Sequence, residues 1–420
     1  MLVIYPASLS GSITAPASKS LTHRFLIACA LAKQPSEIIN PLIAEDTAAT
    51  IQVLEQLGVD FVFQQNGALT VIPPQKFSNV TTPIDCKESG STLRFLIPLF
   101  LHLQKEAAFS GSQRLMERLD PNDLQSIGIS FEKSENLLKV KIAGFPNQLT
   151  MSDSSSTQLI SGVLLTAPLF NKQISITVLN PVLDPYLSMT LAVLKIFRVK
   201  YTLETNPASY TITIPKNQNY IPTQIKVEGD YSQMANFLVA GSLGRGVTVH
   251  NLSYPSVQGD HRIVEILQTS GAEISVGDSW VSVQPSTLKP FRIDLTHIPD
   301  LGPILMGLAS TIEGTSSFTG LKRLIKKESN RLLSTIRILN QFRVKTVLSD
   351  DTLTITGQSA FPGGITINPD NDHRLAMLVA SLASRFEQPV KLTTPKAVDK
   401  SYPHFWEDYQ ALGGKISWED

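Results

Sequence analysis

Six segments of the chain share one pattern of polar and apolar positions. Each begins with small polar residues and continues with a mostly apolar run, as in SKSLTHRFLIACALA and DYSQMANFLVAGSL. They begin near Ser18, Ser89, Ser155, Asp230, Asp300 and Asp370, so they recur every 66 to 75 residues. A helix that is apolar nearly all round is buried, and we therefore expect six buried helices at one regular spacing.

A second series of amphipathic segments alternates with the first. In 46–57 and 328–342 the apolar residues are spaced three and four apart, which predicts helices with one face toward solvent. The series ends at Gly58, Gly128, Arg198, Gly271, Arg343 and Gly413, which are spaced 70 to 73 residues apart. Glycine suits the left-handed position that ends a helix. Because arginine does not, we expect a different helix terminus at Arg198 and Arg343.

Short stretches of alternating hydrophobicity predict strands between the helices. They lie at 69–72, 138–142, 210–214 and 353–355. Each repeat therefore contains two helices and several strands, which indicates an α/β fold. Six repeats of about 70 residues would form two domains of three repeats, in agreement with a length of 420 residues.

The composition argues against several classes of function. The 36 Lys and Arg residues balance the 36 Asp and Glu residues, so the chain has no net charge with which to bind nucleic acid or an anionic membrane. Apolar residues make up 42% of the chain, and the charged fraction of 17% is lower than the usual quarter or so, so we expect most of the chain to be packed rather than disordered. Two cysteines exclude a disulfide framework and a Cys-rich zinc module.

The sequence contains no signal for a cofactor, a metal or a membrane segment. No His or Cys pair has metal-ligand spacing and no glycine-rich nucleotide loop is present, so we expect neither metal nor cofactor. The N-terminal residues lack the pattern of a secretion signal, and no uncharged apolar stretch is long enough to cross a bilayer. We therefore expect a cytoplasmic protein.

Basic residues lie at or near the heads of several predicted helices, where the helix dipole disfavours them. Examples are Lys19, Arg24, Arg94 and Arg374. A bound anion would resolve this conflict, because the N-terminal amides of a helix and a nearby cation both attract phosphate or carboxylate. The pattern therefore predicts an anionic ligand.

Eight motifs carry a resemblance to a known family. They are APASKSLTHR (15–24), ESGSTLRFL (88–96), SSTQLISGVLLTAPL (155–169), VEGDYSQ (227–233), HIPDL (297–301), KKESNRL (326–332), NDHRLAM (371–377) and DKSYPHF (399–405). In this order they resemble the 3-phosphoshikimate 1-carboxyvinyltransferase, or EPSP synthase, family of enolpyruvyl transferases. The resemblance extends from about residue 10 to residue 410.

The resemblance implies a two-domain fold, the inside-out α/β barrel, with three βαβαββ units in each domain. The N-terminal domain would comprise 18–226 and hold shikimate 3-phosphate, and the C-terminal domain would comprise 1–17 and 227–420 and form the second half of the active-site cleft. The family transfers the enolpyruvyl group of phosphoenolpyruvate to the 5-hydroxyl of shikimate 3-phosphate, without metal or cofactor. The resemblance further implies a monomer.

The resemblance also assigns residues to the two substrates. For phosphoenolpyruvate, the phosphate would be held by Lys19, Gly90, Arg114, Gln158 and Lys400, and the carboxylate by Arg331 and Arg374. For shikimate 3-phosphate, the contacts would come from Ser20, Arg24, Ser156, Thr157, Gln158, Asp300 and Lys327. An Arg fork suits a carboxylate because it binds both oxygens.

Asp300 and Glu328 match the family's proton-transfer carboxylates, and Lys19 and Lys327 complete the catalytic set that the resemblance implies. Simpler interpretations remain open on the sequence alone. Asp300 could cap a helix, and Glu328 could be an exposed helix residue. His373 precedes Arg374 and could be either structural or part of the phosphate site.

The sequence departs from the family pattern at two places, which leaves alternative functions open. Leu183 and Asp184 replace a serine and a basic residue of the shikimate phosphate site, and Asn330 replaces an aspartate. One alternative is a UDP-N-acetylglucosamine enolpyruvyl transferase, but Ser20 and the position of Cys86 argue against it. The other is a homologue that binds ligands without catalysis.

Overall fold

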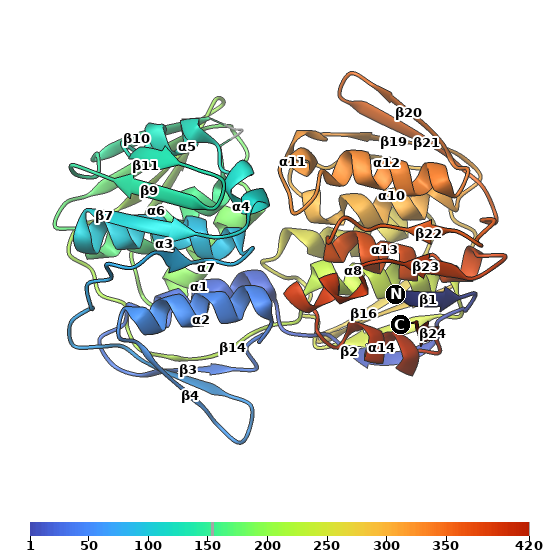
Figure 1. Ribbon diagram of the computed structural model, residues 1–420, viewed down its shortest axis with the longest axis horizontal. Helices are drawn as coiled ribbons and strands as arrows, with labels where there is room; N and C mark the ends of the chain where they lie inside the picture. The colour runs from blue at the N-terminus through green and yellow to red at the C-terminus, as the bar shows by residue number, and fades with distance from the viewer. Residues whose placement is uncertain (153–154, 420) are drawn as a thin grey trace. The chain divides into compact units, whose positions relative to one another are not determined.

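The computed structural model of the protein describes residues 1–152 and 155–419. The chain forms two compact units and passes between them twice. Unit 1 consists of Met1–Pro16 and Glu228–Asp420, and unit 2 consists of Ala17–Val227. Figure 1 shows the strands and helices of both units, with β1 and β24, the first and last strands of the chain, in unit 1.

The predicted βαβαββ repeat is confirmed in the described part of the chain. Each unit contains three four-stranded sheets, and all six sheets share one strand order. The first two strands of a repeat are parallel, and the fourth lies antiparallel between the second and the third. In each repeat one buried helix precedes the second strand, and one or two further helices lie between the second and third strands.

Unit 2 holds the first three repeats. The first consists of β14 (Gln224–Lys226), α1 (Lys19–Ala30), β3 (Ser36–Ile39), α2 (Glu45–Gln56), β4 (Asp60–Phe63) and β5 (Leu69–Ile72). The second consists of β6 (Ile84–Asp85), α3 (Gly90–Gln104), β7 (Glu106–Ser110), α4 (Gln113–Glu117), α5 (Pro121–Ser126), β8 (Ser130–Lys133) and β9 (Leu137–Lys141). The third consists of β10 (Gln148–Ser152), α6 (Thr157–Thr166), β11 (Ile174–Leu179), α7 (Pro185–Ile196), β12 (Thr202–Thr205) and β13 (Tyr210–Ile214).

Unit 1 holds the other three repeats. The fourth consists of β2 (Gly11–Thr14), α8 (Tyr231–Leu243), β15 (Val247–His250), α9 (Ile263–Thr269), β16 (Glu273–Gly277) and β17 (Trp280–Gln284). The fifth consists of β18 (Arg292–Asp294), α10 (Gly302–Ser310), β19 (Gly314–Thr319), α11 (Lys322–Ile325), α12 (Arg331–Gln341), β20 (Lys345–Ser349) and β21 (Thr352–Gly357). The sixth consists of β22 (Thr366–Ile367), α13 (His373–Ser381), β23 (Val390–Leu392), α14 (Phe405–Ala411), β24 (Lys415–Trp418) and β1 (Leu2–Tyr5).

Three strands come from distant parts of the chain. The strand β2 pairs in parallel with β15, and β14 pairs in parallel with β3. The repeat that begins after each crossover therefore takes its first strand from the segment that precedes the other crossover. The strand β1 lies antiparallel between β23 and β24, and the amino group of Met1 donates to the carbonyl of Glu419 at 2.7 Å. Each unit is therefore closed by pairing of residues far apart in sequence.

The six apolar segments form the buried helices that the pattern predicts. They are α1, α3, α6, α8, α10 and α13, and nearly every residue in each is buried. Their side chains build two hydrophobic cores, one in each unit. Burial on this scale supplies most of the stability of each unit, at about 25 cal/mol per Å² of apolar surface. Within the described residues, the helices are all too short or too polar to span a bilayer.

The helix termini correct one expectation. Arg198 and Arg343 both have φ of 62°, in the left-handed region that the glycines at equivalent positions also adopt. At Gly58 and at Arg198 the same hydrogen bond closes the helix: Gly58 N donates to Glu55 O at 2.9 Å, and Arg198 N donates to Lys195 O at 3.1 Å. The prediction of a different helix terminus at Arg198 and Arg343 was wrong. The repeat requires a left-handed turn there, and the stability of the folded repeat outweighs the steric strain of a side chain in that turn.

The amphipathic segment 328–342 is also shorter than predicted. The helix α12 begins at Arg331, and Asn330 is its N-cap, whose side chain accepts from Leu333 N at 3.2 Å. Asparagine caps a helix as well as aspartate does, which explains why the departure from the family pattern is tolerated here. Lys327 and Glu328 therefore lie in the loop before α12.

Candidate active site

In unit 1, one partly buried carboxylate contacts three cations. Asp300 lies in a 3₁₀ turn, Pro299–Leu301, directly before α10. Its Oδ1 accepts from Lys327 Nζ at 3.0 Å and from Arg331 Nη1 at 2.9 Å, and its Oδ2 accepts from Arg374 Nη2 at 3.2 Å. The side chain is only 18% exposed, so these pairs are far less screened than surface pairs. Since Leu301 is the N-cap position of α10, Asp300 does not cap that helix.

Arg331 is the centre of this cluster. It is the first residue of α12, and its side chain is 1% exposed. Its Nη2 donates to Glu328 Oε2 at 2.6 Å, and its Nε donates to Asp372 Oδ2 at 2.8 Å. With Asp300, three carboxylates surround one guanidinium, which fixes its plane in one orientation.

The charges in the cluster shift one another's ionisation. Burial alone would raise the pKa of the Asp300 carboxyl, but the charges of its three cationic neighbours hold that pKa well below its usual range. Burial lowers the pKa of the Lys327 ammonium group, although Asp300 opposes this shift. Burial would also lower the pKa of Arg331, but its carboxylate partners outweigh this and raise it. At neutral pH Asp300 is therefore ionised.

Two more of the predicted cations, Arg374 and Lys400, lie at or beside the head of α13. Asp372 is the N-cap, and its Oδ1 accepts from Arg374 N at 2.9 Å. Arg374 Nη1 donates to the carbonyl of Ser232 at 2.9 Å, whereas its buried Nε has no hydrogen-bond partner among the described residues. Lys400 is buried, and its Nζ donates to the carbonyl of Asn371 at 2.6 Å. The structure therefore gathers the predicted residues Asp300, Lys327, Glu328, Arg331 and Arg374 into one cluster.

His373 is fully buried at the same helix head. Its Nδ1 lies 3.9 Å from Asp372 Oδ1, which is too long for a hydrogen bond.

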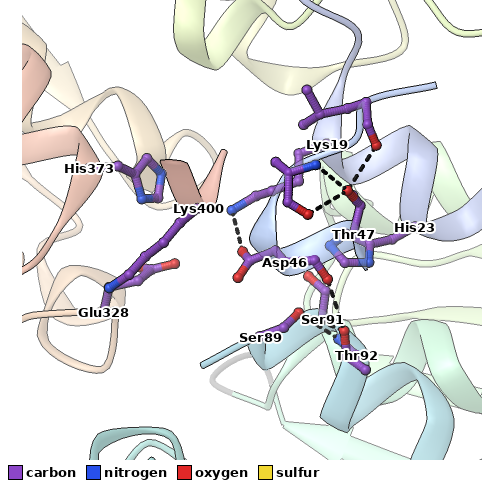
Figure 2. A network of polar contacts seen from close by, with 12 residues as sticks. Lys19, His23, Asp46, Thr47, Ser89, Ser91, Thr92, Glu328, His373 and Lys400 are labelled. Carbon is purple, nitrogen blue, oxygen red and sulfur yellow. Dashed lines mark hydrogen bonds and ion pairs between the residues drawn. The ribbon is translucent and has the colours of Figure 1, made fainter. Parts of the chain in front are cut away.

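In unit 2, Lys19 is held by an acidic partner that the sequence did not suggest. Lys19 begins α1, and its Nζ donates to Asp46 Oδ2 at 2.7 Å. Both side chains are about one-eighth exposed, at 13% and 12%. Figure 2 shows the pair beside Thr47, whose hydroxyl accepts from Ala44 N at 3.0 Å and so fixes the first turn of α2. The ammonium group is thus oriented by protein contacts.

Arg24 is buried in unit 2 and makes several hydrogen bonds within the protein. Its side chain is buried, with the guanidinium 4.9 Å from the centre of the Phe95 ring. Its nitrogens donate to Ser20 O at 2.8 Å, Thr190 Oγ1 at 2.8 Å and Tyr186 O at 2.9 Å. Burial lowers its pKa to about 10, so it remains charged at neutral pH. Arg24 therefore fixes the backbone of Ser20 and contributes positive charge.

The head of α3 brings together a second set of groups. The position that a Cβ atom would take at Gly90 lies 2.7 Å from Arg94 Nη1, 3.2 Å from Arg118 Nη2 and 3.5 Å from Gln158 Oε1. Any side chain at Gly90 would therefore displace the guanidinium of Arg94. Gln158 Nε2 donates to Ser91 Oγ at 3.0 Å, which links the heads of α3 and α6.

The structure brings Arg118, and not Arg114, to Gly90. Arg118 is buried, and its carbonyl accepts from Arg94 Nη2 at 2.8 Å. The side chain of Arg114 is 39% exposed and lies 3.7 Å from Glu117 Oε2. Both arginines belong to one short stretch around α4, so the motif alone did not show which of them faces the helix heads.

The departure from the family pattern at Asp184 has a local structural explanation. Asp184 is the N-cap of α7, and its Oδ1 accepts from Tyr186 N at 2.8 Å. The carboxylate therefore interacts with the backbone of its own helix. It also acts to raise the pKa of nearby Arg24, but the larger effect of burial lowers that pKa.

Ser156 is the N-cap of α6, and its backbone N donates to Asp123 Oδ2 at 3.1 Å. Thr157 is the first residue of the same helix.

The described residues contain no group of three or more His, Cys, Asp and Glu side chains arranged to hold a metal ion.

The chain has the same fold as solved enolpyruvyl transferases. A solved EPSP synthase from Acinetobacter baumannii matches with a TM-score of 0.77 at 24% identity, over 99% of each chain. The enolpyruvyl transferase NikO from Streptomyces tendae also matches with a TM-score of 0.77, at 16% identity, over 99% of this chain and 98% of that one.

The sequence comparisons identify the family within this class. The family model for EPSP synthase (3-phosphoshikimate 1-carboxyvinyltransferase) matches residues 4–409. A 3-phosphoshikimate 1-carboxyvinyltransferase from Clostridium novyi is 35% identical over 98% of this chain and 97% of its own length. One from Clostridium kluyveri is 34% identical over the same shares of both chains. The chain belongs to the EPSP synthase family.

Proposed function

We propose that this protein transfers the enolpyruvyl group of phosphoenolpyruvate to the 5-hydroxyl of shikimate 3-phosphate, with release of phosphate, in aromatic amino acid biosynthesis. The observation that carries the proposal is the partly buried Asp300 carboxylate in contact with three cationic side chains. Such a group can accept a proton while the cations around it bind anionic substrates. Membership of the EPSP synthase family supports the same reaction.

We assign shikimate 3-phosphate chiefly to unit 2. Its proposed contacts are Ser20, Arg24, Ser156, Thr157 and Gln158, with Asp300 and Lys327 from unit 1. The N-terminal amides of α6 favour a phosphate group, and Arg24 supports this role by fixing Ser20. No serine stands at Leu183, so the hydroxyls of Ser156 and Thr157 bear more of the phosphate contact.

We assign phosphoenolpyruvate to cations of both units. Its phosphate is proposed to contact Lys19, Gly90, Gln158 and Lys400, with Arg118 in place of Arg114 on the strength of the geometry around Gly90. Its carboxylate is proposed to contact Arg331 and Arg374. The buried Nε of Arg374 supports this assignment, because it is a donor that a carboxylate could satisfy.

The reaction is proposed to proceed by addition and elimination. Asp300 accepts the proton of the 5-hydroxyl as that oxygen bonds to C2 of phosphoenolpyruvate, and Glu328 donates a proton to the methylene carbon. Glu328 then removes a proton from the new methyl group as the C2–O bond to phosphate breaks and phosphate leaves with the electron pair. Lys19 and Lys327 stabilise the negative charge on the departing phosphate and on the sugar oxygen, respectively.

The decisive test is release of phosphate from phosphoenolpyruvate with different acceptors. The proposal predicts release with shikimate 3-phosphate and none with UDP-N-acetylglucosamine or without an acceptor. Release with UDP-N-acetylglucosamine would assign the protein to the other transferase class. Binding of both substrates without any release would identify a homologue that binds ligands without catalysis.

We further propose that the protein acts as a monomer in the cytoplasm. Both cysteines, Cys29 and Cys86, are buried free thiols, which suits a reducing compartment. A mass near 46.0 kDa by light scattering during size-exclusion chromatography would support the monomer, and twice that mass would contradict it.

A further inference from the structure

A series of buried, hydrogen-bonded side chains links α1, α2 and the start of α3 in unit 2. His23 Nδ1 lies 2.8 Å from Thr50 Oγ1, and Thr50 Oγ1 lies 2.7 Å from Thr92 Oγ1. Thr92 Oγ1 in turn lies 2.7 Å from Ser89 Oγ. The four side chains come from α1, α2 and the start of α3, and all four residues are fully buried. None of the four side chains is among the proposed substrate contacts.

Thr92 connects Gly90 and Lys19, two of the residues that are proposed to hold the phosphate of phosphoenolpyruvate. On one side, Ser89 is the N-cap of α3, and its Oγ accepts from Thr92 N at 3.1 Å directly before Gly90. On the other side, Thr92 Oγ1 also lies 3.3 Å from the carbonyl of Asp46, whose carboxylate holds Lys19. Figure 2 shows Thr92 beside Ser89 and Asp46.

The four side chains from His23 to Ser89 have few protons to donate. Burial, reinforced by the charges of Lys19 and Arg24, lowers the pKa of His23 well below its usual value, so the ring is neutral and carries one N–H. When that N–H is on Nδ1, His23 donates to Thr50, Thr50 donates to Thr92, and Thr92 donates its one proton either to Ser89 Oγ or to the carbonyl of Asp46. Each hydroxyl has one proton, so removal of any one hydroxyl leaves a buried neighbour without its partner.

We propose that Thr92 is a positioning residue that sets Lys19 and Gly90 in the arrangement that phosphoenolpyruvate requires. The proposal rests on the proposed function. Thr92 itself contacts no substrate: it acts through the backbone of Asp46 and through the cap of α3. Loss of its hydroxyl should therefore weaken phosphoenolpyruvate binding more than binding of shikimate 3-phosphate, whose proposed contacts include neither Lys19 nor Gly90.

The test compares Thr92→Val with Thr92→Ser in steady-state kinetics. Valine has the same shape without the hydroxyl, and serine keeps the hydroxyl without the methyl group. We expect Thr92→Val to raise KM for phosphoenolpyruvate about 3- to 10-fold, the effect of one lost buried hydrogen bond, with a smaller change in KM for shikimate 3-phosphate. Thr92→Ser should restore KM for phosphoenolpyruvate to within about twofold of wild type.

The matched control is Thr166→Val. Thr166 is also a fully buried helical threonine of unit 2, but its hydroxyl donates only to Gly162 O of its own helix, at 2.8 Å. It should lower the melting temperature about as much as Thr92→Val and leave both KM values unchanged. Equal changes in the two KM values of Thr92→Val, or the same KM change in Thr166→Val, would overturn the proposal.

A second variant covers the case in which Thr92→Val does not fold. Thr50→Val breaks the series one link earlier and should raise KM for phosphoenolpyruvate in the same selective way; an unchanged KM would contradict the proposal. Absence of activity in the wild-type protein would instead refute the proposed function, so the two failures are distinguishable.

Discussion

The Asp300 carboxylate is ionised, and its cationic neighbours make it a weak base. Its three cationic partners keep its pKa low, so in the absence of ligands the carboxylate has little tendency to take a proton. Anionic substrates that bind Lys327, Arg331 and Arg374 would neutralise part of this positive charge. We therefore expect Asp300 to become a stronger base only when both substrates are bound, which confines proton transfer to the complete complex.

Replacement of the two carboxylates by their amides tests this residue-scale account. Asp300→Asn and Glu328→Gln keep the size of each side chain and remove the base. We expect kcat to fall about 10²- to 10⁴-fold in each, because a general acid or base contributes that much. Substrate binding should survive, since neither change removes a cation. The measurements are kcat and substrate affinity by calorimetry.

The outcome also separates catalysis from structure. Asp300 does not cap α10, so loss of a helix cap cannot explain a defect in Asp300→Asn. Near-normal kcat in either variant would remove that residue from the catalytic role. Loss of binding along with kcat would instead mean that the carboxylate mainly orients the cations around it.

Asp260 provides a pH-dependent prediction. It is buried, and its Oδ2 accepts from Ser232 Oγ at 2.5 Å. Burial, together with the charge of Asp300, raises its pKa to about 7. The usual value in an unfolded chain is about 3.9. Between these values the folded protein retains a proton that the unfolded chain has released, so this group's contribution to stability falls as pH rises from about 4 to about 7.

Asp260→Asn cannot ionise and should escape this loss. The melting temperature of the variant, relative to wild type, should therefore be higher at pH 8 than at pH 5. Differential scanning fluorimetry at both pH values provides the measurement, with Asp278→Asn as a control at an exposed carboxylate. An equal difference at the two pH values would show that Asp260 is not protonated in the folded protein near pH 5.

Single residues show where the sequence was insufficient. The motifs predicted Lys19, Asp300, Lys327, Glu328, Arg331 and Arg374 by their order along the chain, and the structure gathers the last five. The sequence did not indicate Asp46 or Asp372, because an acidic residue in a helix cap or first turn is common and its partner is set by tertiary packing. It also did not distinguish Arg118 from Arg114, since only the orientation of α4 decides between them.

At the scale of elements, the 70-residue period predicted the fold better than any local propensity. Both helix series and the strands 69–72 and 210–214 lie where the pattern placed them. The pattern could not show that β1, β2 and β14 complete sheets far away in sequence, because pairing between distant strands leaves no local signal. It also treated Arg343 as an exception when the repeat imposes the same turn there.

The shared turn predicts a stabilising substitution. Arg343 is exposed and has φ of 62°, which costs a side chain about 1 kcal/mol or more and costs glycine nothing. We expect Arg343→Gly to raise the melting temperature by about 1 to 4 °C, after allowance for the greater flexibility of glycine in the unfolded chain. Gly413→Ala, at the equivalent turn of the sixth repeat, should lower it. A lower melting temperature in Arg343→Gly would show that its side chain stabilises the fold.

At the scale of the whole molecule, the proposed binding groups are divided between two compact units. This division predicts where ligands reduce hydrogen exchange. Shikimate 3-phosphate alone should protect amides of unit 2, especially 155–161. Addition of 2-phospholactate, an unreactive analogue of phosphoenolpyruvate, should also protect 326–331 and 372–377 of unit 1. Protection confined to one unit with both ligands present would contradict the proposed division of roles.

Addition followed by elimination has one direct chemical consequence. If Glu328 protonates the methylene carbon and then removes a proton from the resulting methyl group, solvent hydrogen must enter that carbon during turnover. The measurement is mass spectrometry of the product formed by the wild-type protein from phosphoenolpyruvate and shikimate 3-phosphate in D₂O. The account predicts 5-enolpyruvylshikimate 3-phosphate with deuterium in its methylene group. Absence of this product, or a product without deuterium, would contradict it.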